Sequence, residues 1–234
     1  MPSLAHRGAQ DPDEAARAVR AEYRSRQLLD AAARLMDRDG FHGVSMQALA
    51  DEASVSVGLI YRYFGGKDDL LLAVIVDVLD AFATQVPPAV EAAGDDPVER
   101  IAAAFRAYCD VINEHRHAAI LTYRESKTLG PEGRDKIKKL EIDTSEPLRA
   151  ALREGVASGH LVDVDVELVA HDLLLMAHGW ALKHWYLEQT LGFDDYVAKQ
   201  AALVLNAIVE PESRRHYPEL LALRPSKGRV VLSG

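Results

Sequence analysis

Residues 54–67, SVSVGLIYRYFGGK, carry side chains suited to binding phosphate groups. The hydroxyl groups, Arg62 and Lys67 can all donate hydrogen bonds to phosphate oxygens, and the stretch contains no acid. The formal net charge of the whole chain is −9, which by itself disfavours a nucleic-acid partner. Because the acids gather elsewhere, the local charge is the better guide to what this stretch contacts. A solvated helix face is the alternative interpretation of such a basic cluster.

The histidines and the single cysteine do not form a pattern that supports catalysis or metal binding. His171 and His178 are seven residues apart and share one helical face, with His184 nearby, but a catalytic zinc site needs about three protein ligands. Cys109 has no histidine at a helical-face spacing. The motifs HExxH, GxSxG and GxxxxGKS/T are absent from the sequence. We therefore expect no enzyme, no metal site and no cofactor.

Two short helices are predicted to position the phosphate-binding side chains. Ser45 is expected to cap a helix that ends near Glu52, and Ser56 to cap a second helix that ends at Gly65. The three-residue joint ASV sets two helices at a steep angle, which is the helix-turn-helix arrangement. In that arrangement the N-terminal residues of the second helix contact base edges in the major groove. Four apolar positions are expected to hold the pair together: Leu49, Ala53, Val55 and Ile60.

Aromatic residues of the second short helix are expected to divide between core and surface. Tyr61 and Phe64 are three residues apart, so they share a helical face and are predicted to point inward. Arg62 and Tyr63 are predicted to point outward. Lys67 opens the next helix, where its ammonium group and the helix amides could face a phosphate.

The pattern is helical almost throughout, which predicts an all-α protein. Gly40 is expected to end the helix before the helix-turn-helix, and the helix from Lys67 is expected to stop before Pro87. Pro147 predicts a kink or a break in the helix over 131–156, and residues 164–187 read as one helix. Because no run of about 18 apolar residues and no secretory signal occur, we expect a cytoplasmic protein without a membrane span.

Residues 44–71, VSMQALADEASVSVGLIYRYFGGKDDLL, resemble the DNA-binding signature of TetR-type bacterial transcriptional regulators. The resemblance covers residues 24–72, and the rest of the chain matches as an all-helical body. Two residues depart from the pattern: Ser54 stands where glycine is usual, and Leu59 where a small hydroxyl residue is common. A left-handed turn at Ser54 would cost roughly 1 kcal/mol. The matching residues are Ser45, Leu49, Ala50, Ala53, Val55, Ser56, Gly58, Tyr61, Tyr63, Phe64, Lys67 and Leu70.

The resemblance implies a repressor that binds a palindromic double-stranded DNA operator as a homodimer and is released by a small molecule. It implies a helix-turn-helix domain over 20–68 and a ligand-binding and dimerisation domain over 69–210. The termini themselves predict a flexible extension over 1–19 and a C-terminal segment with a mobile tail over 211–234, which has no usable helical period. The DNA-binding residues that it implies are Ser45, Gln47, Ser56, Val57, Gly58, Leu59, Arg62, Tyr63 and Lys67.

The dimer is expected to form through residues 164–209, because an apolar pattern on more than one helix face requires burial on two sides. The seam is expected around Leu174, Met176 and Trp180. A central helix of a monomer is the alternative.

An elongated apolar effector with an anionic end is expected, with an acyl thioester such as an acyl-CoA as the leading case. Its anionic end would meet Arg116, Arg124 or Lys127. A regulator of drug efflux that responds to planar or cationic compounds is one alternative, and a helical enzyme or interaction module without DNA binding is another. The same side chains could also be ordinary core. The candidate pocket residues are Phe82, Tyr108, Ile112, Tyr123, Arg124, Leu174, Met176, His178 and Trp185.

Overall fold

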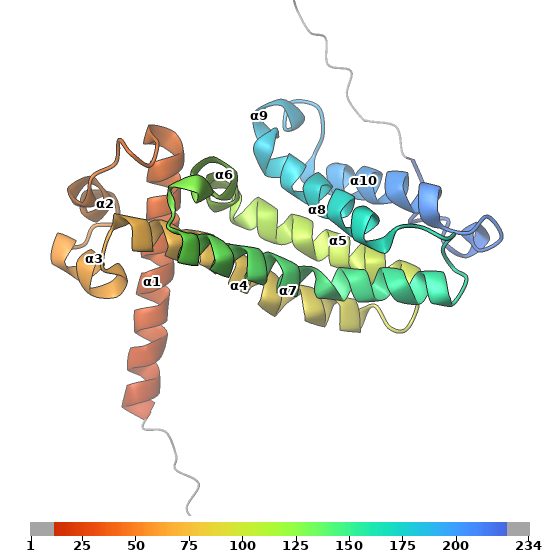
Figure 1. Ribbon diagram of the computed structural model, residues 1–234, viewed down its shortest axis with the longest axis horizontal. Helices are drawn as coiled ribbons and strands as arrows, with labels where there is room; N and C mark the ends of the chain where they lie inside the picture. Colours follow the sequence, from red (N-terminus) through yellow and green to blue (C-terminus); the bar gives the residue numbers. More distant parts are fainter. Residues whose placement is uncertain (1–11, 224–234) are drawn as a thin grey trace, which may run out of the picture. The chain divides into compact units, whose positions relative to one another are not determined.

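The computed structural model describes residues 12–223, and its regular elements there are all helical (Figure 1). This confirms the predicted all-α class. The one β-type contact in the described residues is an isolated bridge between Leu161 and Val209. The chain divides into two compact units, Met1–Val74 and Ile75–Gly234, and the boundary falls inside the helix α4.

The first unit contains α1 (Pro12–Asp39), α2 (Met46–Glu52), α3 (Val57–Phe64) and the first turns of α4 (Lys67–Ala92). The described part of α1 begins at Pro12, so residues 12–19 are helical where a flexible extension was expected. Gly40, with φ +77°, ends α1 as predicted. The buried core of this unit includes Leu28, Ala32, Leu35, Met36, Leu49, Ala50, Ile60 and Leu70.

The joint between α2 and α3 is built from local hydrogen bonds. Ser45 Oγ accepts from the backbone N–H of Ala48 at 3.0 Å, and Ser56 Oγ accepts from that of Leu59 at 3.2 Å, which confirms both predicted caps. Ser54 has φ +54°, the left-handed conformation expected of it. The N–H of Val55 reaches back to the Ala50 carbonyl at 2.9 Å, which closes a Schellman-type C-cap around Ser54.

The second unit is a bundle in which α5 packs against α6, α7, α8 and α10. Its long helices bury apolar faces on one another, and Tyr108 and Phe105 of α5 are among the largest fully buried side chains. The elements after α4 are α5 (Pro97–Glu114), α6 (Arg116–Glu125), η1 (Ser126–Thr128), α7 (Pro131–Ala157), α8 (Val166–Leu182), α9 (His184–Leu187), α10 (Phe193–Ile208) and η2 (Arg214–His216).

Prolines do not interrupt the helices where the sequence suggested that they would. α4 continues through Pro87 and Pro88 to Ala92, which corrects its predicted end, and α7 runs unbroken through Pro147. A proline inside a helix removes the N–H that would bond the carbonyl four residues earlier. Here those carbonyls belong to exposed residues, where water can take the place of the missing donor: Ala83, Thr84 and Asp143.

The predicted single helix over 164–187 is instead two helices, because the chain leaves helical geometry at Lys183, with φ −120° and ψ 23°. The His184 ring then packs edge-on against Trp180 at 5.0 Å and contacts Arg116 of α6. Apolar residues continue into α9, but Trp185 is 65% exposed there. An apolar run alone therefore overestimated the length of α8.

By length and composition, α4 is the one helix of the described chain that could cross a membrane. The core helix of a soluble protein meets the same criterion. Within each unit α4 contributes buried side chains, including Leu71, Val74, Ile75 and Val78. The absence of a membrane span stays a prediction.

The C-terminal segment after α10 is partly described. Tyr217 is buried, and its hydroxyl donates to Asp96 at 2.8 Å, which ties residues near 217 to the N-terminus of α5. The remainder of the predicted mobile tail, residues 224–234, lies outside the described residues.

Candidate functional site

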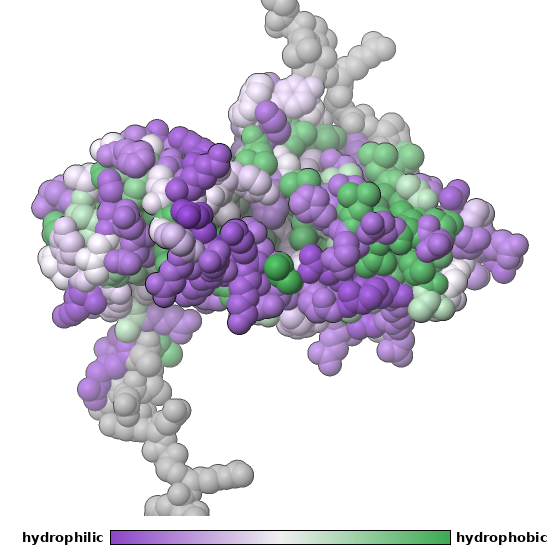
Figure 2. Space-filling model, viewed as in Figure 1, coloured by the Kyte–Doolittle hydropathy of each residue, from purple (hydrophilic) through white to green (hydrophobic). Residues whose placement is uncertain are grey.

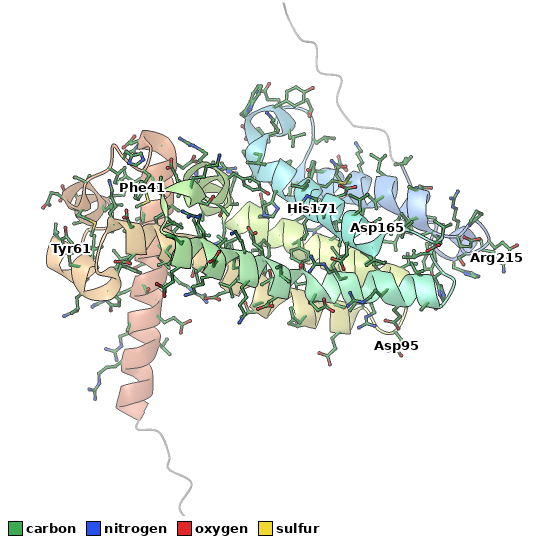
Figure 3. All side chains as sticks on the ribbon, in the orientation of Figure 1. Phe41, Tyr61, Asp95, Asp165, His171 and Arg215 are labelled. Atoms are coloured by element: carbon green, nitrogen blue, oxygen red, sulfur yellow. The ribbon has the colours of Figure 1, made fainter. Side chains whose placement is uncertain are left out.

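The outer face of α3 carries exposed aromatic and basic side chains. Arg62 and Tyr63 are exposed, and the guanidinium carbon of Arg62 lies 5.9 Å from the centre of the Tyr63 ring. Tyr61 is 49% exposed and lies at the surface of α3 (Figure 3), so its predicted inward orientation is wrong. Ile60 and half-buried Phe64, which are four residues apart, form the inner face instead. Tyr61 follows Ile60 directly in the sequence, so its side chain points away from that face.

Polar and small residues around the α2–α3 joint leave several groups available to a partner. The hydroxyls of Ser45 and Ser56 accept hydrogen bonds as caps, so each O–H can still donate. Gln47 donates to Asp51 at 2.8 Å. Gly58 is exposed, and a Cβ there would meet nothing within 4 Å, so protein packing does not require a glycine. Val57 and Leu59 are half-buried.

Lys67 is held by the protein itself. Its Nζ donates to the carbonyl oxygens of Phe41 at 3.0 Å and Val44 at 2.9 Å, and it lies 4.6 Å from the centre of the Phe41 ring. Two of the three ammonium protons are therefore used to fix the α1–α2 loop onto the first residue of α4. One N–H of the ammonium group remains for a phosphate, whereas the sequence suggested that the whole ammonium group would face one.

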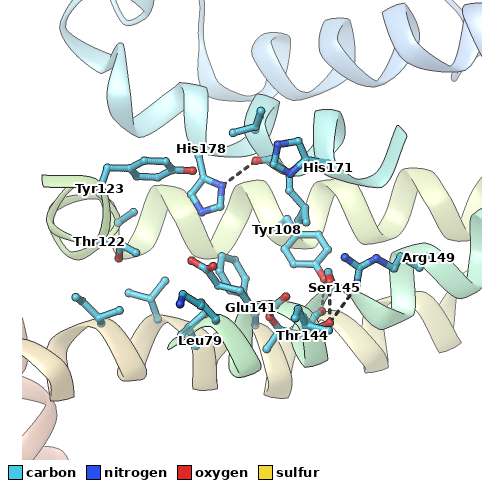
Figure 4. Close-up of a pocket in the computed structure, with 18 residues that line it drawn as sticks. Leu79, Tyr108, Thr122, Tyr123, Glu141, Thr144, Ser145, Arg149, His171 and His178 are labelled. Carbon is cyan, nitrogen blue, oxygen red and sulfur yellow. Dashed lines mark hydrogen bonds between the residues drawn. The ribbon is translucent and has the colours of Figure 1, made fainter. Parts of the chain in front are cut away.

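A cavity of about 400 Å³ lies in the second unit among α4, α5, α6, α7 and α8 (Figure 4). Helix α4 supplies apolar side chains to the wall, and α7 supplies several polar ones. The lining residues are Ile75, Val78, Leu79, Phe82, Tyr108, Ala119, Thr122, Tyr123, Lys138, Glu141, Ile142, Thr144, Ser145, Arg149, His171, Leu174, Leu175 and His178.

Some of the predicted pocket residues line this cavity, and others lie elsewhere. Ile112 is fully buried away from the cavity, and Arg124 and Trp185 are exposed outside it. Met176 also does not line it, nor do Arg116 and Lys127, which were expected to meet an anionic end. The predicted residues that the structure brings together are Phe82, Tyr108, Tyr123, Leu174 and His178.

None of the pocket residues predicted from the sequence lies on α7, although this helix lines the cavity. Its inward face is marked by Thr144 and Ser145, which are buried polar residues. The Tyr108 hydroxyl donates to the Thr144 carbonyl and joins α5 to α7. Two small hydroxyl residues in the middle of a charged helix were the available signal.

Both cations of the cavity wall already have acidic partners. Arg149 Nε lies 2.8 Å from a carboxylate oxygen of Glu167, and Lys138 Nζ lies 3.1 Å from one of Asp135. By contrast, the side chain of Glu141 has neither a hydrogen bond nor an ion pair within the described chain. The residue is exposed overall, and partial burial of its carboxyl group raises the pKa. Among the described residues, the wall therefore contains both an acceptor and a donor without a hydrogen bond: the carboxylate of Glu141 and Nε of Arg149.

His178 is a half-buried titratable side chain of the wall. Its Nδ1 lies 2.8 Å from the Leu174 carbonyl, and its ring lies edge-on to Phe82 and Tyr123, with centroids 6.2 and 5.4 Å away. Burial lowers the pKa of the imidazole, so the ring is neutral near pH 7.

An exposed apolar face lies on α8 and α10. Leu168, Leu175 and Leu182 are exposed at seven-residue spacing along α8, and Leu203 of α10 is 58% exposed. Hydrophobic side chains gather over this region in Figure 2. The predicted seam residues lie differently: Trp180 is buried within its own unit, where its indole donates to Asn113 at 2.8 Å, and Leu174 lines the cavity.

Comparison with known proteins finds two family models that match consecutive parts of the chain. Bacterial regulatory proteins of the tetR family match residues 28–74, and the tetracyclin repressor-like C-terminal domain matches residues 94–208. The HTH-type transcriptional regulator HbdR of Aromatoleum sp. (strain CIB) is 36% identical over 190 residues, which are 81% of each chain. The HTH-type transcriptional repressor KstR2 of Mycolicibacterium smegmatis is 28% identical over 201 residues, covering 81% of this chain and 93% of that one.

A solved structure is similar to the described fold along most of its length. The crystal structure of AibR in complex with isovaleryl coenzyme A and operator DNA superposes with a TM-score of 0.66 at 25% identity. The match covers 78% of this chain and 97% of AibR.

Proposed function

The chain belongs to the TetR family of bacterial regulatory proteins, and we propose that it is a repressor released from its operator when a small, mostly apolar effector fills the cavity of the second unit. Membership makes it a helix-turn-helix DNA-binding transcriptional regulator and not an enzyme. Because it acts on operator DNA, we place it in the cytoplasm. We assign DNA binding to residues 20–68 and effector binding and dimerisation to residues 69–210.

One observation carries the ligand-switched mechanism. The same helix, α4, lines the cavity from Ile75 to Phe82 and begins at Lys67, whose ammonium group holds the α1–α2 loop. A ligand that prefers a shifted α4 would therefore act on the DNA-binding unit through one continuous element. It can shift the equilibrium only by the difference between its affinities for the two states.

DNA contact is proposed through the exposed face of α3 and the caps beside it. Arg62, Tyr63 and the serine hydroxyls are donors suited to phosphate oxygens. Lys67 retains one N–H for the same purpose. The proposed contact set is Ser45, Gln47, Ser56, Val57, Gly58, Leu59, Arg62, Tyr63 and Lys67.

A homodimer is proposed through α8 and α10, so that two recognition helices reach the half-sites of a palindromic operator. The seven-residue spacing of Leu168, Leu175 and Leu182 gives one continuous apolar stripe on α8. Such a contiguous stripe on the surface of a folded protein is typical of a contact with another chain.

An acyl thioester is the leading effector class. The cavity of about 400 Å³ lies within the range of small-molecule sites, and its α4 wall suits an apolar acyl group. AibR, which shares the fold at 25% identity, binds isovaleryl coenzyme A. A planar cationic effector is the second candidate, favoured by the unpaired carboxylate of Glu141 beside the rings of Phe82, Tyr108 and Tyr123.

Gel shifts with the DNA upstream of the protein's own gene test the proposal. We expect a specific, salt-sensitive complex with this DNA. Acyl thioesters should dissociate the complex more effectively as their chain length increases, and they should raise the melting temperature of the protein in the same order. Dissociation by planar aromatic cations alone would favour the second candidate. The absence of any specific complex, together with turnover of a substrate, would refute the regulator.

A further inference from the structure

We propose that the effector carries a hydrogen-bond donor, a hydroxyl or N–H group, on the part that enters the cavity, and that Nε2 of His178 selects it. This inference rests on the proposed function, because it requires that the cavity bind the effector. It adds a specificity-determining residue and narrows the chemical class of the ligand.

The hydrogen bond of His178 fixes its tautomer. Nδ1 lies 2.8 Å from the Leu174 carbonyl oxygen, and a carbonyl can only accept, so Nδ1 carries the proton. In a neutral imidazole the other nitrogen is then an acceptor. No hydrogen bond to Nε2 occurs within the described chain, and the ring reaches from α8 into the cavity (Figure 4).

Neighbouring rings hold this imidazole in place. The planes of Phe82 and Tyr123 stand at 77° and 72° to it, at centroid distances of 6.2 and 5.4 Å. A flip of the ring would place a carbon against the Leu174 carbonyl and lose the hydrogen bond. Nε2 is thus a fixed acceptor surrounded by aromatic side chains, which suits a flat ligand that bears a polar hydrogen.

Among the described residues, this part of the wall also offers the carboxylate oxygens of Glu141, and each of its cations has an acidic partner. The side chain of Glu141 has no hydrogen bond or ion pair within the described chain, and burial together with the nearby Glu141 charge raises the pKa of the Tyr123 hydroxyl. Lys138 and Arg149 are paired with Asp135 and Glu167. A purely hydrocarbon group would exclude water from Nε2 without forming a hydrogen bond to it, whereas a ligand donor would form that hydrogen bond. We therefore expect roughly ten-fold or greater preference for a hydroxylated ligand over its deoxy analogue.

Matched ligand pairs on the full-length protein test this selection by calorimetry. The thioester probes are octanoyl-CoA with 3-hydroxyoctanoyl-CoA, and benzoyl-CoA with its hydroxylated forms. Phenethylamine with tyramine is the pair for the cationic class. His178→Phe keeps a flat ring and removes the acceptor, and His216→Phe makes the same change at an exposed histidine of η2 that does not line the cavity. His178→Met is the second variant if His178→Phe does not fold.

We expect the wild type and His216→Phe to prefer the hydroxylated member of at least one pair about ten-fold, and the His178 variants to bind both members of that pair equally. The inference would be overturned by any of three results. The wild type could bind the two members of every pair equally, the preference could survive in the His178 variants, or no probe could bind. If thioesters release the DNA but the hydroxylated and deoxy members of each pair bind equally, the proposed function stands and the selection by His178 is refuted. If only the amine pair binds and discriminates, the selection stands and the thioester class fails.

Discussion

Replacing Lys67 with methionine should destabilise the DNA-binding unit, because the side chain ties the α1–α2 loop to α4. Methionine keeps the unbranched shape and removes the charge. The change deletes two hydrogen bonds from Nζ, to Phe41 O at 3.0 Å and Val44 O at 2.9 Å, and the contact with the Phe41 ring at 4.6 Å. The side chains of Phe41 and Val44 are buried, so water reaches their carbonyls only in part.

The magnitude follows from these contacts. A hydrogen bond from a charged donor contributes about 1.5–3 kcal/mol to stability, and a cation–π contact about 0.5–1 kcal/mol when exposed. Lys67 is half-buried, so water replaces part of what is lost, and we expect the free energy of unfolding to fall by about 2–3 kcal/mol.

Urea unfolding followed by circular dichroism measures this loss, and Arg62→Met is the matched control. Arg62 is an exposed cation of α3, so its replacement should leave stability within about 0.5 kcal/mol of the wild type while weakening operator binding. If Lys67 serves only as a phosphate contact, Lys67→Met will unfold at the wild-type urea concentration and lower the salt slope of DNA binding by about one unit. That result would refute the structural role assigned here.

Three further predictions concern the turn, the apolar face and the cavity. Ser54→Gly should stabilise the protein by about 1 kcal/mol in urea unfolding, because Ser54 has φ +54°; an unchanged midpoint would show that the turn is unstrained. Leu168→Glu with Leu203→Glu should yield a folded monomer by sedimentation, because these side chains are exposed within one chain and a dimer would bury the new charges; a persistent dimer would place the interface elsewhere. Because the pKa of His178 is lowered in the folded protein, the imidazole is protonated first in the unfolded chain as pH falls through about 6.5. The free energy of unfolding is therefore highest above that pH and declines below it. His178→Phe should flatten this decline between pH 7 and 5, and an identical pH profile would contradict the buried neutral state.

Features that depend on neighbours along the chain could be predicted from the sequence. The caps at Ser45 and Ser56 and the left-handed turn at Ser54 each involve hydrogen bonds within five residues. The apolar face of α1 likewise follows from helical spacing alone. The helix-turn-helix and the all-α class were therefore predictable, since side-chain spacing and cap chemistry act locally.

The ends of helices were harder to predict, because exposure to water decides them. Pro87 and Pro88 lie inside α4, where the unpaired carbonyls are on the exposed side. α8 stops at Leu182, although the apolar sequence continues, because His184 is held by Trp180 and Arg116. Propensity gave the wrong end in both cases because it contains no information on which groups meet solvent or which distant side chains they contact.

Lys67 and the cavity were decided by tertiary structure. The carbonyl partners of Lys67 are 23 and 26 residues earlier in the chain, and no local pattern indicates them. The sequence named Tyr108, Tyr123 and His178 as candidate pocket residues, but it could not show that α7 faces them with Glu141. Which faces of distant helices meet depends on how all the side chains between them pack together. The identity of the motif is therefore determined locally, whereas the composition of the cavity wall is determined only when the bundle has formed.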